Sequence, residues 1–207
     1  MSPPHPQESV MQLSLLPLAL ALAFAAGTTH AQSTAPAEMP ASAQSTSPAD
    51  AHSTAPNDAQ IASIVVTANQ VDIDAGKLAA SKAHSKEVKS FAKQMVRDHT
   101  SVNKAATALV KRLKVTPENN DTSKSLKKAG QDNIAPLKTL KGTAFDRAYV
   151  AHEVSYHQTV IDALDKTLLP SAQNADLKAL LEKSRPTFIQ HLDHAKQLET
   201  SLGKSGS

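Results

Sequence analysis

Hydrophobic residues recur every three or four positions along four stretches of the chain, which is the spacing of helices that bury one face. The clearest stretch lies between Val88 and Leu113, where the steps between apolar positions alternate between four and three residues. We predict four helices, each with a residue that can cap its N-terminus: 58 to about 83 with Asp58, 85 to about 114 with Ser85, 143 to about 168 with Thr143, and 174 to about 202 with Asn174.

The connections between these helices predict how they pack. The first and second helices, like the third and fourth, are joined by short turns and should run antiparallel. The second and third are joined by a longer segment that is weakly helical from 122 to about 133, is interrupted by Pro136, and is expected across one end of the bundle. Pro186 lies inside the fourth helix and should bend it. The pattern thus predicts an all-α, antiparallel four-helix bundle with a partly helical connection between its second and third helices.

Each predicted helix places one polar residue that could bind a metal near the middle of its mostly apolar face. These residues are Asp72, His99, His157 and His191, and each lies near the middle of its helix. Because an antiparallel bundle of similar helices brings their midpoints to one level, we expect the four side chains to meet. Buried imidazoles and carboxylates need partners, and this set is suited to binding a divalent transition metal ion.

Two interpretations of this polar level remain open. In the first, the four side chains bind one Zn, Fe, Mn, Cu or Ni ion. The residues expected to support the metal ligands through hydrogen bonds are Asp98, Asp146, Tyr149 and Glu153. In the second, the same side chains form a hydrogen-bonded polar layer that sets the register of the helices without metal.

The first 57 residues differ in composition from the helical part. Residues 1–31 contain a short apolar run followed by small residues, which is typical of a signal peptide, with Met1 or Met11 as the start. Residues 32–57 are rich in Ala, Ser, Thr and Pro, which is typical of a disordered linker. We therefore predict a domain at residues 58–203 in a periplasmic or secreted protein, without a transmembrane anchor once the signal peptide is removed.

Positive charge is concentrated in the helical part. All 22 Lys and Arg residues follow Gln60 but only 15 of the 19 acidic residues do, so this part has a formal charge of +7. Such a surface can attract anionic envelope surfaces, whereas an aromatic content of 3% disfavours nucleic-acid binding. The absence of cysteine excludes disulfides and a thiol nucleophile.

Four segments carry a resemblance to a known family: DIDAGKLAASKA at 72–83, FAKQMVRDHT at 91–100, FDRAYVAHEVSYHQ at 145–158 and RPTFIQHL at 185–192. From about residue 60 to 202 the chain resembles the bacterial exported family DUF4142, a domain of unknown function placed among the ferritin-like four-helix folds. The resemblance implies a ferritin-like bundle and an exported location, without an established activity.

Ferritin-like proteins often bind two irons through Glu-x-x-His motifs, which this chain lacks. The residues three positions before its candidate histidines are Val96, Val154 and Phe188. We therefore expect no ferroxidase or di-iron chemistry. The leading hypothesis is a non-enzymatic envelope binding or structural module with one mononuclear metal site. The alternatives are a periplasmic metal-storage protein or mononuclear metalloenzyme, and a module that binds anionic envelope surfaces.

Overall fold

Helices make up most of the described chain, residues 55–204 of a computed structural model. They are α1 (Asp58–Lys82), α2 (Lys86–Leu113), α3 (Asp121–Thr139), α4 (Gly142–Ala163), the π-helix η1 (Leu164–Leu168), α5 (Leu169–Ser171) and α6 (Ala175–Lys204). No strand occurs in this range, so the predicted all-α class is confirmed. The predicted signal peptide and nearly all of the predicted linker lie outside the described residues. Within residues 55–204, no helix combines the length and apolar character that a membrane span requires.

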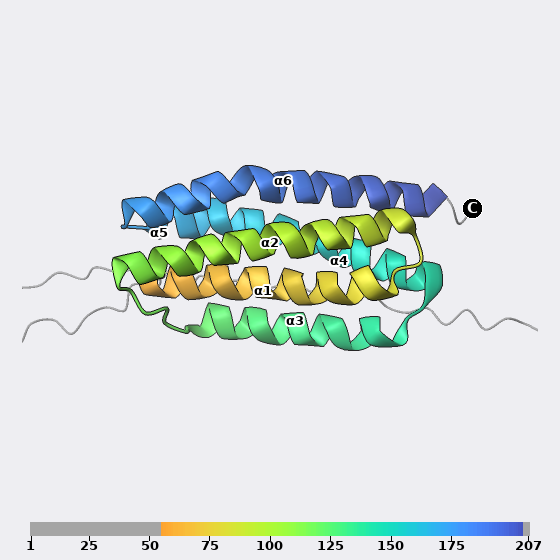
Figure 1. The fold of residues 1–207 in the computed structure, drawn as a ribbon, viewed down its shortest axis with the longest axis horizontal. Helices are drawn as coiled ribbons and strands as arrows, with labels where there is room; N and C mark the ends of the chain where they lie inside the picture. Colours follow the sequence, from red (N-terminus) through yellow and green to blue (C-terminus); the bar gives the residue numbers. More distant parts are fainter. Residues whose placement is uncertain (1–54, 205–207) are drawn as a thin grey trace, which may run out of the picture. The chain divides into compact units, whose positions relative to one another are not determined.

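The bundle is formed by α1, α2, α4 and α6. Helix α1 packs against α2 and α4, and α6 packs against the same two helices (Figure 1). One apolar cluster joins Ile61 near the start of α1 to Leu109 near the end of α2, so these two helices run antiparallel as predicted. The second apolar cluster joins Phe145 near the start of α4 to Leu198 near the end of α6, so this pair is also antiparallel.

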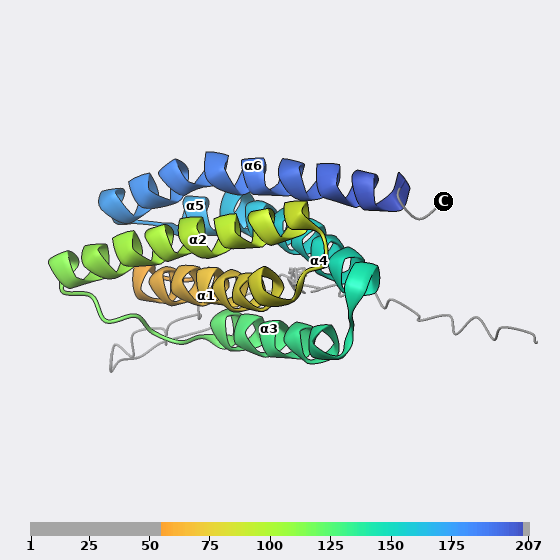
Figure 2. The ribbon, with the colours of Figure 1, turned by 45° about the vertical axis from the view of Figure 1, so that its right-hand side comes forward.

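The connection between α2 and α4 differs from the prediction. It forms the helix α3, which continues through Pro136 to Thr139 and packs along α1 rather than across one end of the bundle (Figure 2). Pro136 is exposed and lies in the last turn, where its missing N–H removes one helical hydrogen bond without ending the helix. Gly130 allows the close approach of α3 to α1, because a Cβ there would lie 2.7 Å from a methyl carbon of Val71.

Two of the four predicted N-caps are confirmed. The Ser85 side chain accepts hydrogen bonds from the first backbone amides of α2, and the Asn174 side chain does the same for α6. Helix α1 is capped by Asn57 and not by Asp58, whose carboxylate instead accepts from two backbone amides that precede α6. Thr143 does not cap α4, which begins one residue earlier without a side-chain cap.

Pro186 lies within α6, which continues past it as one helix. The neighbouring Arg185 donates two hydrogen bonds to Asp165 in η1, at 2.6 and 2.7 Å. Paired bonds of this kind fix the orientation of both side chains. This pair therefore ties α6 to the π-helical turn that follows α4.

The core consists of two apolar clusters with a polar level where one cluster gives way to the other. The first cluster includes Ile61 and Leu109, and the second includes Phe91 and Leu198. The largest buried polar side chains of the level are Asp72 on α1, His99 on α2, Glu153 and His157 on α4, and His191 on α6, each at most 2% exposed. Since burial of polar groups is costly without partners, this level is a candidate binding site.

Replacing Gly130 by alanine should weaken the packing of α3 on α1. The added Cβ would lie 2.7 and 2.9 Å from the two methyl carbons of Val71. We expect G130A to lower the free energy of unfolding, measured in urea, by about 1–3 kcal/mol. The control is G203A, because a Cβ at Gly203 meets no atom within 4 Å. Equal stability of the two variants would contradict the described packing.

Candidate metal centre

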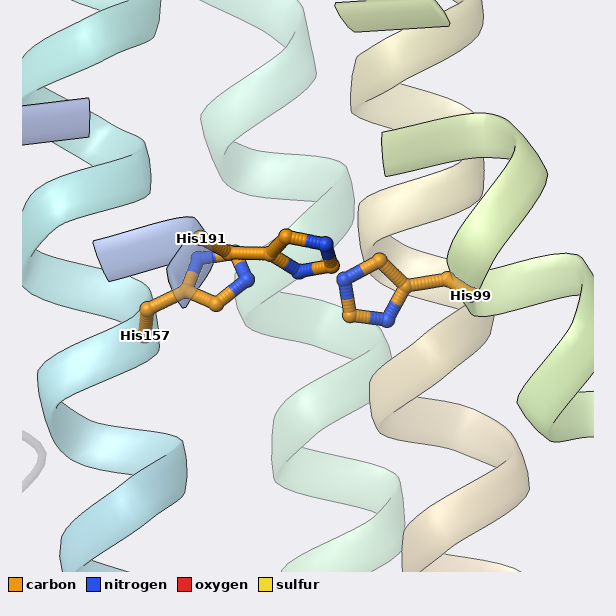
Figure 3. Close-up of side chains that lie close together, drawn as sticks. All are labelled: His99, His157 and His191. Atoms are coloured by element: carbon orange, nitrogen blue, oxygen red, sulfur yellow. The ribbon is translucent and has the colours of Figure 1, made fainter. Parts of the chain in front are cut away.

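Three imidazole rings meet at the polar level. They come from His99 on α2, His157 on α4 and His191 on α6, and their centroids lie 5.1, 5.3 and 5.5 Å apart. One ring nitrogen of each histidine lies within 4.8 Å of one from each of the others. Figure 3 shows the rings turned toward one another from three different helices. All three are buried, at 0 to 2% exposed.

Hydrogen bonds indicate which nitrogen of the His99 ring carries its proton. Nδ1 of His99 lies 2.7 Å from Oδ1 of Asn69, and the amide nitrogen of Asn69 donates to the carbonyl of Val65. Because the Asn69 oxygen can only accept, Nδ1 of His99 donates and Nε2 keeps a lone pair. Nε2 is buried and has no hydrogen-bond partner within the described part of the chain.

The same reasoning applies to the other two rings. Nδ1 of His157 donates to the backbone carbonyl of Glu153 at 3.0 Å, and Nε2 of His191 donates to Oδ2 of Asp98 at 3.1 Å. When the rings are neutral, lone pairs therefore remain on Nε2 of His157 and Nδ1 of His191. Both atoms are buried and, among residues 55–204, lack a hydrogen-bond partner. Three nitrogen lone pairs at one level of the bundle could bind a transition metal ion such as Zn²⁺.

Two carboxylates predicted to support the histidines lie beside them. Oδ2 of Asp98 accepts from His191, and Oε2 of Glu153 lies 3.4 Å from Nδ1 of His157. A carboxylate on the far side of a ligating imidazole fixes the ring's orientation and raises the basicity of its free nitrogen. Asp98 and Glu153 thus lie next to His191 and His157, and their supporting role stays a prediction.

Asp72 occupies a different place from the one predicted. Its Oδ2 lies 3.5 Å from Nδ1 of His99, the nitrogen that already donates to Asn69. It belongs to a second group with Glu153 and His157, whose ligand atoms lie within 4.8 Å of one another. Of the four predicted ligands, the three histidines therefore form one group. Asp72 is not part of that group and lies beside Nδ1 of His99.

The other two predicted supporting residues do not bind a histidine ring. Asp146 accepts from the backbone N–H groups of His84 and Ser85, at 2.9 and 2.7 Å, and thereby holds the turn between α1 and α2. Tyr149 is fully buried against two phenylalanine rings, and its hydroxyl has no hydrogen-bond partner in the described structure. For Asp146, the predicted supporting role is therefore wrong.

Burial and neighbouring charges shift the pKa values at this level. Burial would lower the pKa of His157, but Asp72 and Glu153 raise it to about 9. Burial lowers the pKa of His99 well below its usual value and that of His191 to about 4, and the charge of His157 adds to both shifts. Burial also raises the pKa of Asp72, while His157 lowers that of Glu153 against the effect of burial. Near neutral pH the metal-free level therefore holds one charged imidazole, and a metal ion must displace its proton.

Sequence reasoning missed two neighbours of His99. Asn69 accepts its proton, and the ring of Phe188 stacks on it at a centroid distance of 5.4 Å with 5° between the planes. Asn69 precedes Asp72 by three residues and so lies on the same face of α1. A buried amide at that spacing was a signal of a larger polar network.

The fold and the site together define a class: a helical bundle whose core contains a cluster of buried histidines suited to binding one metal ion. The sequence matches the family described as Domain of unknown function (DUF4142) over residues 43–198, and the chain belongs to this family. The match begins before α1, inside the stretch predicted to be a linker. A search of curated proteins and a search of solved structures found no match.

The metal-free protein should be most stable near pH 6.5, the usual pKa of histidine. Below it, the unfolded chain takes up protons that buried His99 and His191 do not, so stability falls toward the His191 pKa of about 4. The raised pKa of Asp72 has the opposite effect, because this carboxyl group binds a proton more readily in the folded protein. The two histidines together should have the larger effect on stability. Above it, folded His157 keeps a proton that the unfolded chain loses, so stability falls again up to its pKa of about 9.

Urea unfolding in the presence of a chelator, from about pH 4 to about pH 9, measures this dependence. The alkaline fall should approach about 1.4 kcal/mol per pH unit and should largely disappear in His157→Gln. His84→Gln is the control, because His84 is exposed in the turn between α1 and α2. An unchanged alkaline fall in His157→Gln would show that the charge lies elsewhere.

Proposed function

We propose that this protein is an exported, non-enzymatic bundle of ferritin-like type that binds one divalent transition metal ion. The ligands are Nε2 of His99, Nε2 of His157 and Nδ1 of His191. The observation that carries the proposal is that each of these nitrogens is buried and unpartnered within residues 55–204, while the other nitrogen of the same ring is held by an acceptor. Buried polar atoms normally have a partner, and an ion would supply one to all three.

The chemistry of the ligands favours particular metals. Imidazole nitrogen suits Zn, Cu, Ni and Fe, whereas Mg and Ca prefer oxygen ligands. Three neutral imidazoles leave the charge of a divalent ion uncompensated, and the nearby carboxylates of Asp72, Asp98 and Glu153 offset it. A water molecule as fourth ligand would complete the tetrahedral set usual for Zn²⁺.

A binding role is favoured over catalysis by the position of the histidines. Their rings are at most 2% exposed, so a substrate larger than a small ion or a water molecule has no surface on which to reach the metal. A groove between α1 and α2, lined by Lys77, Lys104 and Lys111 among others, includes none of the three histidines. Metal storage and metalloenzyme activity are the alternatives, and turnover assays of the metal-loaded protein would distinguish them.

Export is part of the proposal and rests on the sequence. The short apolar run before Gln32 is typical of a signal peptide, and the lack of cysteine leaves no residue for lipid attachment after cleavage. A periplasmic or secreted protein follows. Determining the N-terminal residue of the mature protein tests this location, since cleavage after Ala31 should place Gln32 first.

Metal binding is tested on protein purified without an affinity tag. Isothermal titration with Zn²⁺ or Co²⁺ should give tight stoichiometric binding, and Co²⁺ should show the absorption of a nitrogen-coordinated ion. The double variant His99→Gln, His157→Gln should weaken binding at least about 100-fold, because it removes two of three ligands. His84→Gln is the matched control and should bind as the wild type does. Tight Co²⁺ binding that survives the double variant would refute the ligand assignment.

Replacing Asp98 by asparagine should weaken the metal site without removing a ligand. Asp98 accepts the proton of Nε2 of His191, and an amide is a weaker acceptor than a carboxylate. Loss of such an outer partner typically lowers metal affinity about 10- to 100-fold. Zn²⁺ titration of Asp98→Asn measures the change. An affinity equal to that of the wild type would argue against a metal on Nδ1 of His191.

A further inference from the structure

A second group of ligand atoms lies next to the three histidines. Asp72, Glu153 and His157 each present a ligand atom within 4.8 Å of those of the other two. His157 belongs to both groups: its Nε2 is the free nitrogen, while its Nδ1 lies 3.4 Å from the carboxylate of Glu153. Glu153 therefore lies beside Nδ1 of the His157 ring and not beside the free Nε2.

The oxygens of this group are buried without partners. Oδ1 of Asp72 and both Oε1 and Oε2 of Glu153 accept no hydrogen bond from any described residue. The nearby Nδ1 protons are already donated elsewhere, that of His99 to Asn69 and that of His157 to a backbone carbonyl. The charged His157 ring therefore balances part of the charge of these carboxylates but leaves their free oxygens without a hydrogen-bond donor within the described range.

The hydroxyl of Tyr149 is a further buried oxygen on the same helix as Glu153. Tyr149 is fully buried, and its hydroxyl also lacks a hydrogen-bond partner in the described range. Tyr149 precedes Glu153 by four residues in α4, so their side chains lie on the same face of the helix one turn apart. Burial and the neighbouring carboxylates of Glu153 and Asp72 raise the pKa of this hydroxyl. The Tyr149 ring packs against Phe91 and Phe145.

We propose that Asp72, Glu153 and Tyr149 form a second cation position, adjacent to the three-histidine centre and suited to a hard divalent ion such as Mn²⁺. Carboxylate and hydroxyl oxygens select such ions, whereas the imidazole centre selects Zn²⁺ or Co²⁺. With both positions filled, the carboxylates of Asp72, Glu153 and Asp98 supply three negative charges against the four positive charges of the two ions. The inference extends the proposed function, on which it rests through the shared His157, but its oxygen ligands are separate from the first centre.

This position differs from a di-iron site built from Glu-x-x-His motifs, which the sequence lacks. Its oxygens come from α1 and from successive turns of α4, at Tyr149 and Glu153. A proton shared between the two carboxylates is the competing way to satisfy the group. That arrangement would leave no room for an ion, so binding measurements separate the two.

The test titrates Mn²⁺ into metal-free protein and into protein loaded with one equivalent of Zn²⁺, with free Mn²⁺ read by electron paramagnetic resonance. We expect one Mn²⁺ per chain in the Zn-loaded protein. Tyr149→Phe should weaken Mn²⁺ binding about tenfold and leave Zn²⁺ affinity unchanged, because it removes one oxygen and none of the nitrogen ligands. Glu153→Gln should abolish Mn²⁺ binding. Circular dichroism of each variant checks that the helices are retained.

Asp98→Asn is the matched control, since it removes a half-buried carboxylate charge that accepts from His191 and from Arg97 but belongs to neither group of ligand atoms. It should weaken Zn²⁺ binding and leave Mn²⁺ binding as in the wild type. Zn²⁺ binding without any Mn²⁺ binding would refute the second position and leave the proposed function standing. Mn²⁺ binding that Tyr149→Phe and Glu153→Gln do not change would also refute it. Mn²⁺ binding with these variant effects but no Zn²⁺ binding would support the second position and refute the three-histidine centre.

Discussion

The burial of imidazoles and carboxylates between two apolar clusters is the constraint on which the rest of this structure depends. A polar group removed from water without a partner costs several kcal/mol, and an uncompensated charge costs more. Helices packed around such a level must therefore provide acceptors for its protons and balance its charges. In this bundle the apolar clusters on either side stabilise the fold, while the polar level determines what the protein can bind.

The hydrogen bonds at this level connect helices as well as rings. Asn69 of α1 accepts from His99 of α2, and Asp98 of α2 accepts from His191 of α6. These bonds form only when the three helices are in the correct register. These two bonds hold the proton of His99 on Nδ1 and that of His191 on Nε2, while the carbonyl of Glu153 holds that of His157 on Nδ1 within α4. In each ring, when neutral, the other nitrogen keeps its lone pair. A layer that sets register and a layer that binds metal are thus compatible, because one set of bonds serves both purposes.

The sequence predicted the helical class, the two antiparallel pairs and the presence of one polar residue on each buried helix face. These features follow from periodicity, which reflects local geometry that every helix shares. Ser85 and Asn174 were predicted as caps for the same reason, since capping acts within a few residues. The helix α3 was the main error: Pro136 suggested an interruption, but an exposed proline in a last turn costs one hydrogen bond and does not end a helix.

The sequence by itself determined that three histidines and an aspartate lie on buried faces, because spacing along a helix is a local property. Only the tertiary structure decided which ring nitrogens face one another, that Asp72 lies behind His99, and that Asp146 holds a turn. The reason is physical: ring orientation depends on which acceptor a neighbouring helix offers, and that depends on how the helices are rotated and aligned against each other. Periodicity gives the face on which a residue lies but carries no information about the side chain opposite it.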